Sequence, residues 1–329
     1  MTADPLRPSA PAPVFRRPRW RGHPLLVHLA GVAATFVTTT YFGGWHHAAF
    51  LADFGQDPPA LPPAQFWRGG LWFSLSVMGI LGAHEWGHYL TCRWYRVDAS
   101  LPYFLPAPLP LTGTFGAFIR IRDAIPHKRA LFDIGASGPF AGFVVAVPLL
   151  VLGLSLSRLV PVNVTEHLDL IALGEPLLFR LMQGAVWGAV PESQTLHLHP
   201  MALAAWFGLL ATALNLFPLA QLDGGHLAYA VAGRHARWIT LATAATAIGL
   251  TFVSISWVAW AIVMLGVLLA AGVQHPPTLD DHLPLGRARV ALTAAAALVF
   301  VLCFTPAPVT PIAGIVSDLA PASGSAQRP

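Results

Sequence analysis

Residues 71–94 read LWFSLSVMGILGAHEWGHYLTCRW, an apolar run that carries His84, Glu85 and His88 in its last third. Histidines four residues apart lie on one face of a helix, because four residues make slightly more than one turn. The pattern H-E-x-x-H on a helix is typical of a zinc metalloprotease, in which the imidazoles bind the metal and the glutamate handles the protons of water. Ionisable side chains at the depth of a bilayer are costly, so here they indicate function. The rest of the chain must supply a membrane-spanning scaffold and a further ligand.

The composition of the chain is that of a polytopic membrane protein. Of its 329 residues 55% are hydrophobic and 10% are charged, and the mean hydropathy is +0.60. The expected fold class is therefore all-α, and the lipid bilayer is an expected partner. The sequence pI of about 9.5 does not indicate nucleic acid, because the basic residues lie in short segments between apolar runs. We expect no direct nucleic-acid partner.

Apolar stretches predict about seven transmembrane helices, with six also possible. They lie at residues 25–42, 71–94, 131–156, 201–217, 239–254, 257–273 and 290–304, and the pair at 239–273 could instead be partly re-entrant. This arrangement places 15 of the 19 basic residues on one side. By the positive-inside rule that side is cytoplasmic and includes the N-terminus. We expect a multi-pass protein of a bacterial inner membrane.

The same reading divides the chain into five parts. They are a disordered basic arm (1–22), a first transmembrane helix with an outer loop (23–66), a core of the second to fourth helices with a β element and an outer amphipathic segment (67–235), the C-terminal transmembrane helices (236–305) and a flexible tail (306–329).

A small β-hairpin or sheet associated with the membrane is expected after the second helix. Prolines at 102, 106, 108 and 110 exclude a helix or a central strand there, and residues 114–122 (TFGAFIRIR) end in strand-like alternation. Such a strand could offer its edge to an extended substrate. It could also be a cytoplasmic linker hairpin, which periodicity alone slightly favours.

A catalytic zinc takes three protein ligands, so one more must reach His84 and His88. Asp223 is the best candidate, because it follows the helix break at Pro218 at the inner end of a descending span. Its depth in the bilayer is then the depth predicted for the two histidines.

Two other side chains compete for a place at the metal. Asp133 begins the third span at a similar depth, but it lies near Lys128 and Arg129, so an ion pair or a helix N-terminus explains it more simply. His226 is one turn beyond Asp223, and it could support a ligand or contact substrate.

Two separated motifs resemble those of the site-2 protease family of intramembrane zinc metalloproteases, in the type that lacks a PDZ domain. One is His84-Glu85-Trp86-Gly87-His88, and the other is NLFP at 215–218 followed by LDG at 222–224. The match covers most of residues 71–235. The resemblance implies one Zn²⁺ per chain bound by His84, His88 and Asp223, Glu85 as the catalytic residue, and Asn215 as a substrate or oxyanion contact.

The resemblance also implies a role for the predicted strand. Residues 114–122 would form the family's membrane-associated sheet, with Thr114, Phe115, Gly116 and Phe118 binding substrate. The expected activity is cleavage of transmembrane segments in membrane-anchored proteins that have a single transmembrane helix. A metal-ion or proton transporter using the same site is the alternative, but few other ionisable groups lie in the apolar runs and no internal repeat is obvious.

Overall fold

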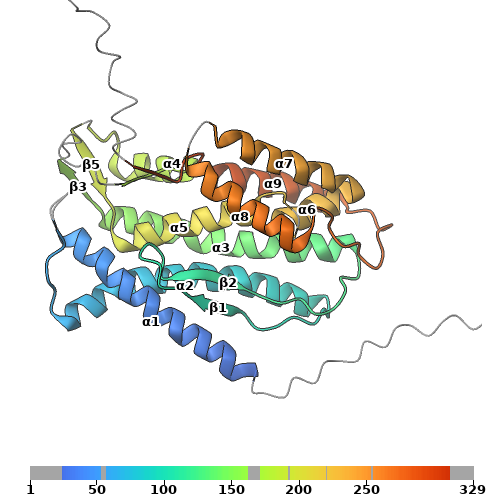
Figure 1. The fold of residues 1–329 in the computed structure, drawn as a ribbon, viewed down its shortest axis with the longest axis horizontal. Coiled ribbons are helices and arrows are strands. Elements are labelled where there is room, and N and C mark those ends of the chain that lie inside the picture. Colours follow the sequence, from blue (N-terminus) through green and yellow to red (C-terminus); the bar gives the residue numbers. More distant parts are fainter. Residues whose placement is uncertain are drawn as a thin grey trace, which may run out of the picture.

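The computed structural model describes residues 24–52, 57–161, 171–191, 193–219, 221–252 and 255–311. The described chain is mostly helical with small antiparallel sheets (Figure 1). The basic arm predicted at 1–22 and most of the predicted tail lie outside these residues.

A helix corresponds to each of the seven predicted spans. These helices are α1 (Pro24–Leu51), α2 (Pro63–Trp94), α3 (Lys128–Leu156), α5 (Pro200–Leu216), α7 (Ala236–Leu250), α8 (Ser256–Ala271) and α9 (Arg287–Cys303). Shorter helices are α4 (Leu177–Trp187), α6 (Asp223–Ala232) and the 3-10 turn η2 (Gly233–His235). By length and composition, Leu25–Leu51 and Lys128–Leu156 are long and apolar enough to cross a membrane.

The first predicted span, 25–42, ends too early, because α1 continues to Leu51. Glycines at positions 43 and 44 let this last part of α1 pack closely against α2. A Cβ on Gly43 would lie 2.5 Å from the carbonyl oxygen of Gly70 in α2, so the two helices approach at their backbones. Small residues allow such contacts between apolar helices.

Helix α2, which carries the H-E-x-x-H motif, is packed between other helices of the bundle. It contacts α1, α3 and α5, and α3 in turn contacts α5, α6 and α9. The main core lies around α3 and α5, where Leu150, Trp206 and Leu209 are fully buried. The motif is therefore held on the buried side of a helix that has little freedom to move.

The predicted hairpin after the second helix is present. Strands β1 (Tyr103–Pro106) and β2 (Thr114–Phe118) pair antiparallel, with Tyr103 opposite Phe118. Helix α1 holds the hairpin, because the Thr38 hydroxyl donates to the Gly113 carbonyl (2.7 Å). Figure 1 shows the hairpin beside α1 and α2.

Two further strand pairs lie around the outer segment that was predicted at 158–199. They are β3 (Arg158–Pro161) with β5 (Gln194–His197), and β4 (Ile171–Leu173) with β6 (Val309–Pro311). The tail predicted to be flexible from residue 306 is therefore wrong for 309–311. Its strand partner lies far back in the chain, where no local pattern points to it.

Candidate metal centre

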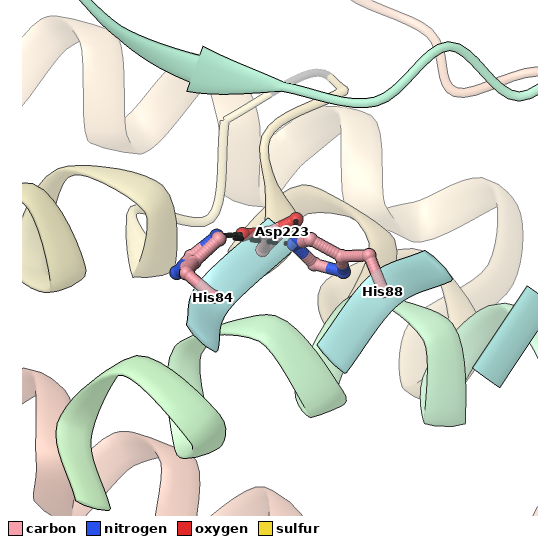
Figure 2. Close-up of side chains that lie close together, drawn as sticks. All are labelled: His84, His88 and Asp223. Carbon is pink, nitrogen blue, oxygen red and sulfur yellow. Dashed lines mark hydrogen bonds and ion pairs between the residues drawn. The ribbon is translucent and has the colours of Figure 1, made fainter. Parts of the chain in front are cut away.

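Three side chains that could bind one metal ion meet between α2 and α6. Nε2 of His84 lies 3.1 Å from Oδ2 of Asp223, and Nε2 of His88 lies 3.3 Å from Oδ1 of the same carboxylate. The two Nε2 atoms are 3.0 Å apart. Figure 2 shows the two rings and the carboxylate directed toward one another. Within the described residues this is the group of three or more such side chains that could hold a metal.

These donor atoms fit a zinc ion. Ligands about 2.0–2.1 Å from a tetrahedral zinc are separated from one another by roughly 3.3 Å, close to the three distances here. His88 Nδ1 lies 2.7 Å from the carbonyl oxygen of Ile134, which can only accept, so Nδ1 carries the proton. Nε2 of His88 is then left as a lone-pair donor facing Asp223, and a backbone carbonyl on the other ring nitrogen is typical of metal-binding histidines.

The wall behind the two histidines is a glycine-containing face of α3. A Cβ on Gly138 would lie 2.1 Å from Nε2 of His88, and one on Gly142 would lie 3.3 Å from Cβ of His84. Helix α3 therefore packs closely against α2 at the turns where α2 carries its two histidines.

The break after α5 brings Asp223 to the histidines. Helix α5 ends at Leu216, and α6 begins at Asp223. A Cβ on Gly224 would lie 2.1 Å from the carbonyl oxygen of Leu216, so the chain turns back tightly there. Asn215, in the last turn of α5, has its Nδ2 3.3 Å from Nε2 of His84. Both parts of the second sequence motif therefore reach the first.

Glu85 is buried beside the three groups, with 6% of its surface exposed. It lines a cavity of about 210 Å³ together with His84, His88 and Asp223. The backbone of Ile119 lies within hydrogen-bonding reach of its carboxylate. The chain just after β2 therefore covers the site, and a strand crosses above the three side chains in Figure 2.

The substrate-binding residues predicted on the hairpin are only partly at this cavity. Phe118 lines it. Thr114 is buried and its hydroxyl donates to the Leu105 carbonyl (2.7 Å), while Phe115 is 70% exposed. Gly116 has φ +101°, a conformation that favours glycine.

Other cavity residues were not predicted as site residues. They are Ala117, Ile119, Ile121, Ile134, Gln221 and Leu222. Alternation in 114–122 could have indicated Ile119 and Ile121, since they lie on the same strand-like run. His226, which the sequence placed one turn after Asp223 as a support for a ligand or a substrate contact, also lines the cavity.

Asp133 lies outside the candidate metal site, where its carboxylate is paired with other side chains. Its carboxylate accepts two hydrogen bonds from Arg289 of α9, at 2.7 and 2.8 Å, and one from the Tyr95 hydroxyl at 2.5 Å. An ion pair was predicted, but the suggested partners Lys128 and Arg129 are wrong. Arg289 lies 156 positions further along the chain, beyond the reach of a local argument.

A helix-borne H-E-x-x-H whose histidines meet a carboxylate from a second element defines a candidate metallopeptidase centre. The sequence profile of peptidase family M50 matches residues 72–256, which include all three groups, and the chain belongs to this family. This confirms the resemblance to the site-2 proteases.

Several plant proteins are similar to the chain. It is 29% identical over 268 residues to the probable zinc metalloprotease EGY1, chloroplastic, of Arabidopsis thaliana, a match covering 78% of this chain and 47% of that protein. It is 32% identical over 194 residues to the probable zinc metalloprotease EGY2, chloroplastic, of Oryza sativa subsp. indica, covering 57% and 33%. The chain thus spans about half the length of the first relative and a third of the second. No solved structure matches the chain.

Proposed function

We propose that this protein is a zinc-dependent intramembrane endopeptidase that cleaves transmembrane segments of membrane-anchored proteins. The observation that carries the proposal is the meeting of His84, His88 and Asp223 beside the buried carboxylate of Glu85. Membership of family M50 and the names of the relatives as probable zinc metalloproteases support the same activity.

The residues of the site divide the work of peptide hydrolysis. When bound by His84, His88 and Asp223, zinc supplies a Lewis acid for water and for the scissile carbonyl. Glu85 takes the proton of the attacking water and then gives it to the leaving amine. Asn215 directs its Nδ2 group into the cavity and serves as a hydrogen-bond donor to the developing oxyanion.

The hairpin offers a place for the substrate. A helical segment hides its carbonyl groups in i to i−4 hydrogen bonds, so it must unwind before its peptide bonds can be attacked. Among the described residues β2 pairs only with β1, so its second edge can pair with an extended segment. Thr114, Phe115, Gly116 and Phe118 lie on this strand, whose continuation covers Glu85.

The membrane arrangement is part of the proposal. In this proposal the seven helices that correspond to the predicted spans cross the bilayer, with the N-terminus and the metal centre toward the cytoplasmic side. Membership of M50 and the apolar helices support a membrane location. The predicted bacterial inner membrane has no support from the relatives, whose names place them in chloroplasts.

The test compares wild type, Glu85→Gln and Glu175→Gln in membranes with a single-span substrate. Glu175 is a half-exposed residue that pairs with Arg180 (3.7 Å), far along the chain from the site, so it controls for the substitution itself. We expect near-stoichiometric zinc in all three proteins. Cleavage should occur in wild type and Glu175→Gln and be lost in Glu85→Gln. Cleavage that survives in Glu85→Gln, or absence of bound zinc in wild type, would overturn the proposal, and metal-dependent ion flux without cleavage would favour a transporter.

A further inference from the structure

One of the other polar side chains of the cavity is held by a loop from the C-terminal part of the chain. His226 of α6 lines the cavity, and its Nδ1 lies 2.6 Å from Nε2 of His275. His275 belongs to the connection between α8 and α9, residues 272–286. Two histidine rings at this distance, 49 residues apart in sequence, share one proton in a hydrogen bond.

The direction of that hydrogen bond follows from the next contact. Nδ1 of His275 lies 2.6 Å from the carbonyl oxygen of Pro276. A carbonyl only accepts, so Nδ1 of His275 carries a hydrogen, and Nε2 of the neutral ring is an acceptor. His226 therefore donates from Nδ1 to His275. The remaining ring nitrogen of His226, Nε2, keeps its lone pair and can accept a hydrogen bond.

The loop that carries His275 is fixed at several points. The ring of His275 stacks on Tyr229, with centroids 4.6 Å apart. The Tyr229 hydroxyl donates to Asp281 of the same loop (2.6 Å), and so does the hydroxyl of Thr278 (2.6 Å). The amide of Leu279 donates to the Ile125 carbonyl (3.0 Å). The loop is thus bound both to α6 and to the segment before α3.

On its other side, His226 is packed against α3. A Cβ on Gly135 would lie 2.8 Å from Cβ of His226. The side chain therefore has α3 against its Cβ and the loop at its Nδ1. His226 is thus held by two contacts at the wall of the cavity, and its Nε2 is the ring nitrogen that can contact a substrate.

We propose that His226 is a substrate-contacting residue, whose Nε2 accepts a hydrogen bond from a main-chain N–H of the unwound substrate beside the scissile bond, and that His275 is its positioning residue. An unwound segment brings N–H groups that have lost their helical acceptors, and leaving one of them buried without a partner is costly. His226 supplies an acceptor from α6, a different element from the hairpin that also lines the cavity. This inference rests on the proposed peptidase activity.

The test uses full-length protein and synthetic single-span peptides in which one amide near the scissile bond at a time is replaced by an ester. Each ester removes one N–H donor. In wild type we expect one ester position to lower kcat/KM by about tenfold. In His226→Leu the parent peptide should already be cleaved about tenfold more slowly, and that ester should cost nothing more. Zinc content should stay as in wild type.

Conservative variants separate contact from structure. His226→Gln places an amide oxygen near the former Nε2 position, so sensitivity to the ester should partly return. His275→Leu should behave like a weaker His226→Leu, whereas His275→Gln keeps an acceptor for His226 and should be close to wild type. His282→Leu, at an exposed position of the same loop, is the matched control and should change nothing.

The outcomes are distinct from those for the proposed function. If wild type cleaves the parent peptide but every ester costs wild type and His226→Leu equally, His226 does not accept from the substrate and the inference is wrong. Wild-type rates in His226→Leu would also overturn it. If wild type binds zinc but cleaves no peptide, the proposed function itself fails, and this inference falls with it.

Discussion

Gly138 of α3 lies directly against the imidazole of His88. A Cβ at this glycine would be 2.1 Å from Nε2 of His88, the atom that faces Asp223. The ring cannot retreat without breaking its 2.7 Å hydrogen bond to the Ile134 carbonyl. A glycine at position 138 of α3 therefore leaves the space that the His88 imidazole needs in the candidate metal site.

Gly138→Ala should therefore remove the metal while leaving the helices in place. The added methyl pushes the His88 ring away from His84 and Asp223, so we expect zinc affinity to fall by more than about tenfold. Zinc stoichiometry after dialysis against a weak chelator measures this. Gly79→Ala on α2, where an added Cβ meets nothing within 4 Å, should keep its zinc. Equal zinc in both variants would contradict the expectation.

Asn215→Leu should separate chemistry from metal binding. Asn215 lies 3.3 Å from His84 through its amide nitrogen, but it is outside the three-ligand group. Removing an oxyanion donor commonly lowers kcat by about 10²–10³-fold. We expect a loss of kcat in that range with KM and zinc content little changed, measured on a single-span peptide. Loss of zinc in Asn215→Leu would instead make the residue a support for His84.

The ion pair between Arg289 and Asp133 should contribute to stability. Both side chains are about three-quarters buried, so removing one partner leaves a poorly solvated charge. Arg289→Leu and Asp133→Asn should each lower the free energy of unfolding by roughly 1–3 kcal/mol. A double-mutant cycle in thermal unfolding should give a coupling between them. The pair Arg122–Asp98 is nearly half exposed, and its cycle should give less than about 1 kcal/mol.

The loop between α8 and α9 should depend on pH through Asp281. Burial alone would raise the pKa of this carboxyl, but hydrogen bonds from Thr278 and Tyr229 outweigh burial and hold the pKa below its usual value. A lowered pKa in the folded protein stabilises it above the unfolded-state pKa of about 3.9, and that stability is lost as the pH falls through the folded value. Near neutral pH the free energy of unfolding of wild type should thus exceed that of Asp281→Asn by about 1 kcal/mol, which raises the unfolding midpoint of wild type.

The difference between the two proteins should begin to shrink as the pH falls below about 4, where the carboxyl is protonated in the unfolded chain, and should be lost once the pH is below the lower pKa of the folded protein as well. Asp280→Asn, at the neighbouring exposed position, should change the midpoint little. A gap between wild type and Asp281→Asn that is the same at every pH would contradict the argument.

The sequence was most informative where function and periodicity coincide. Histidines at i and i+4 predict a shared helix face, and charge asymmetry put Asp223 at the same level, so the geometry of these three could be expected. The hairpin was predictable from prolines and alternation. Its exact use was not: Phe118 lines the cavity, while Thr114 is turned toward Leu105. The pairing shifts by one residue between Thr114 and Gly116, which offsets the alternation of the strand, and the sequence pattern does not predict this irregularity.

Contacts between segments far apart in the sequence were the main features that the sequence did not predict. Arg289 with Asp133 and His275 with His226 both join the last third of the chain to the core. Nothing in the local pattern of either residue indicates a partner, because pairing at such distances depends on how the helices assemble. The strand at 309–311 escaped notice for the same reason.

The ligands of the centre are distributed along the chain in a way that sets the order of its maturation. His84 and His88 emerge early during synthesis, but the carboxylate of Asp223 follows 139 positions later, after α3 and α5 have been made. A nascent chain therefore has two imidazoles and no complete site. Zinc loading, and with it the proposed peptidase activity, must wait until most of the polypeptide has been made and assembled.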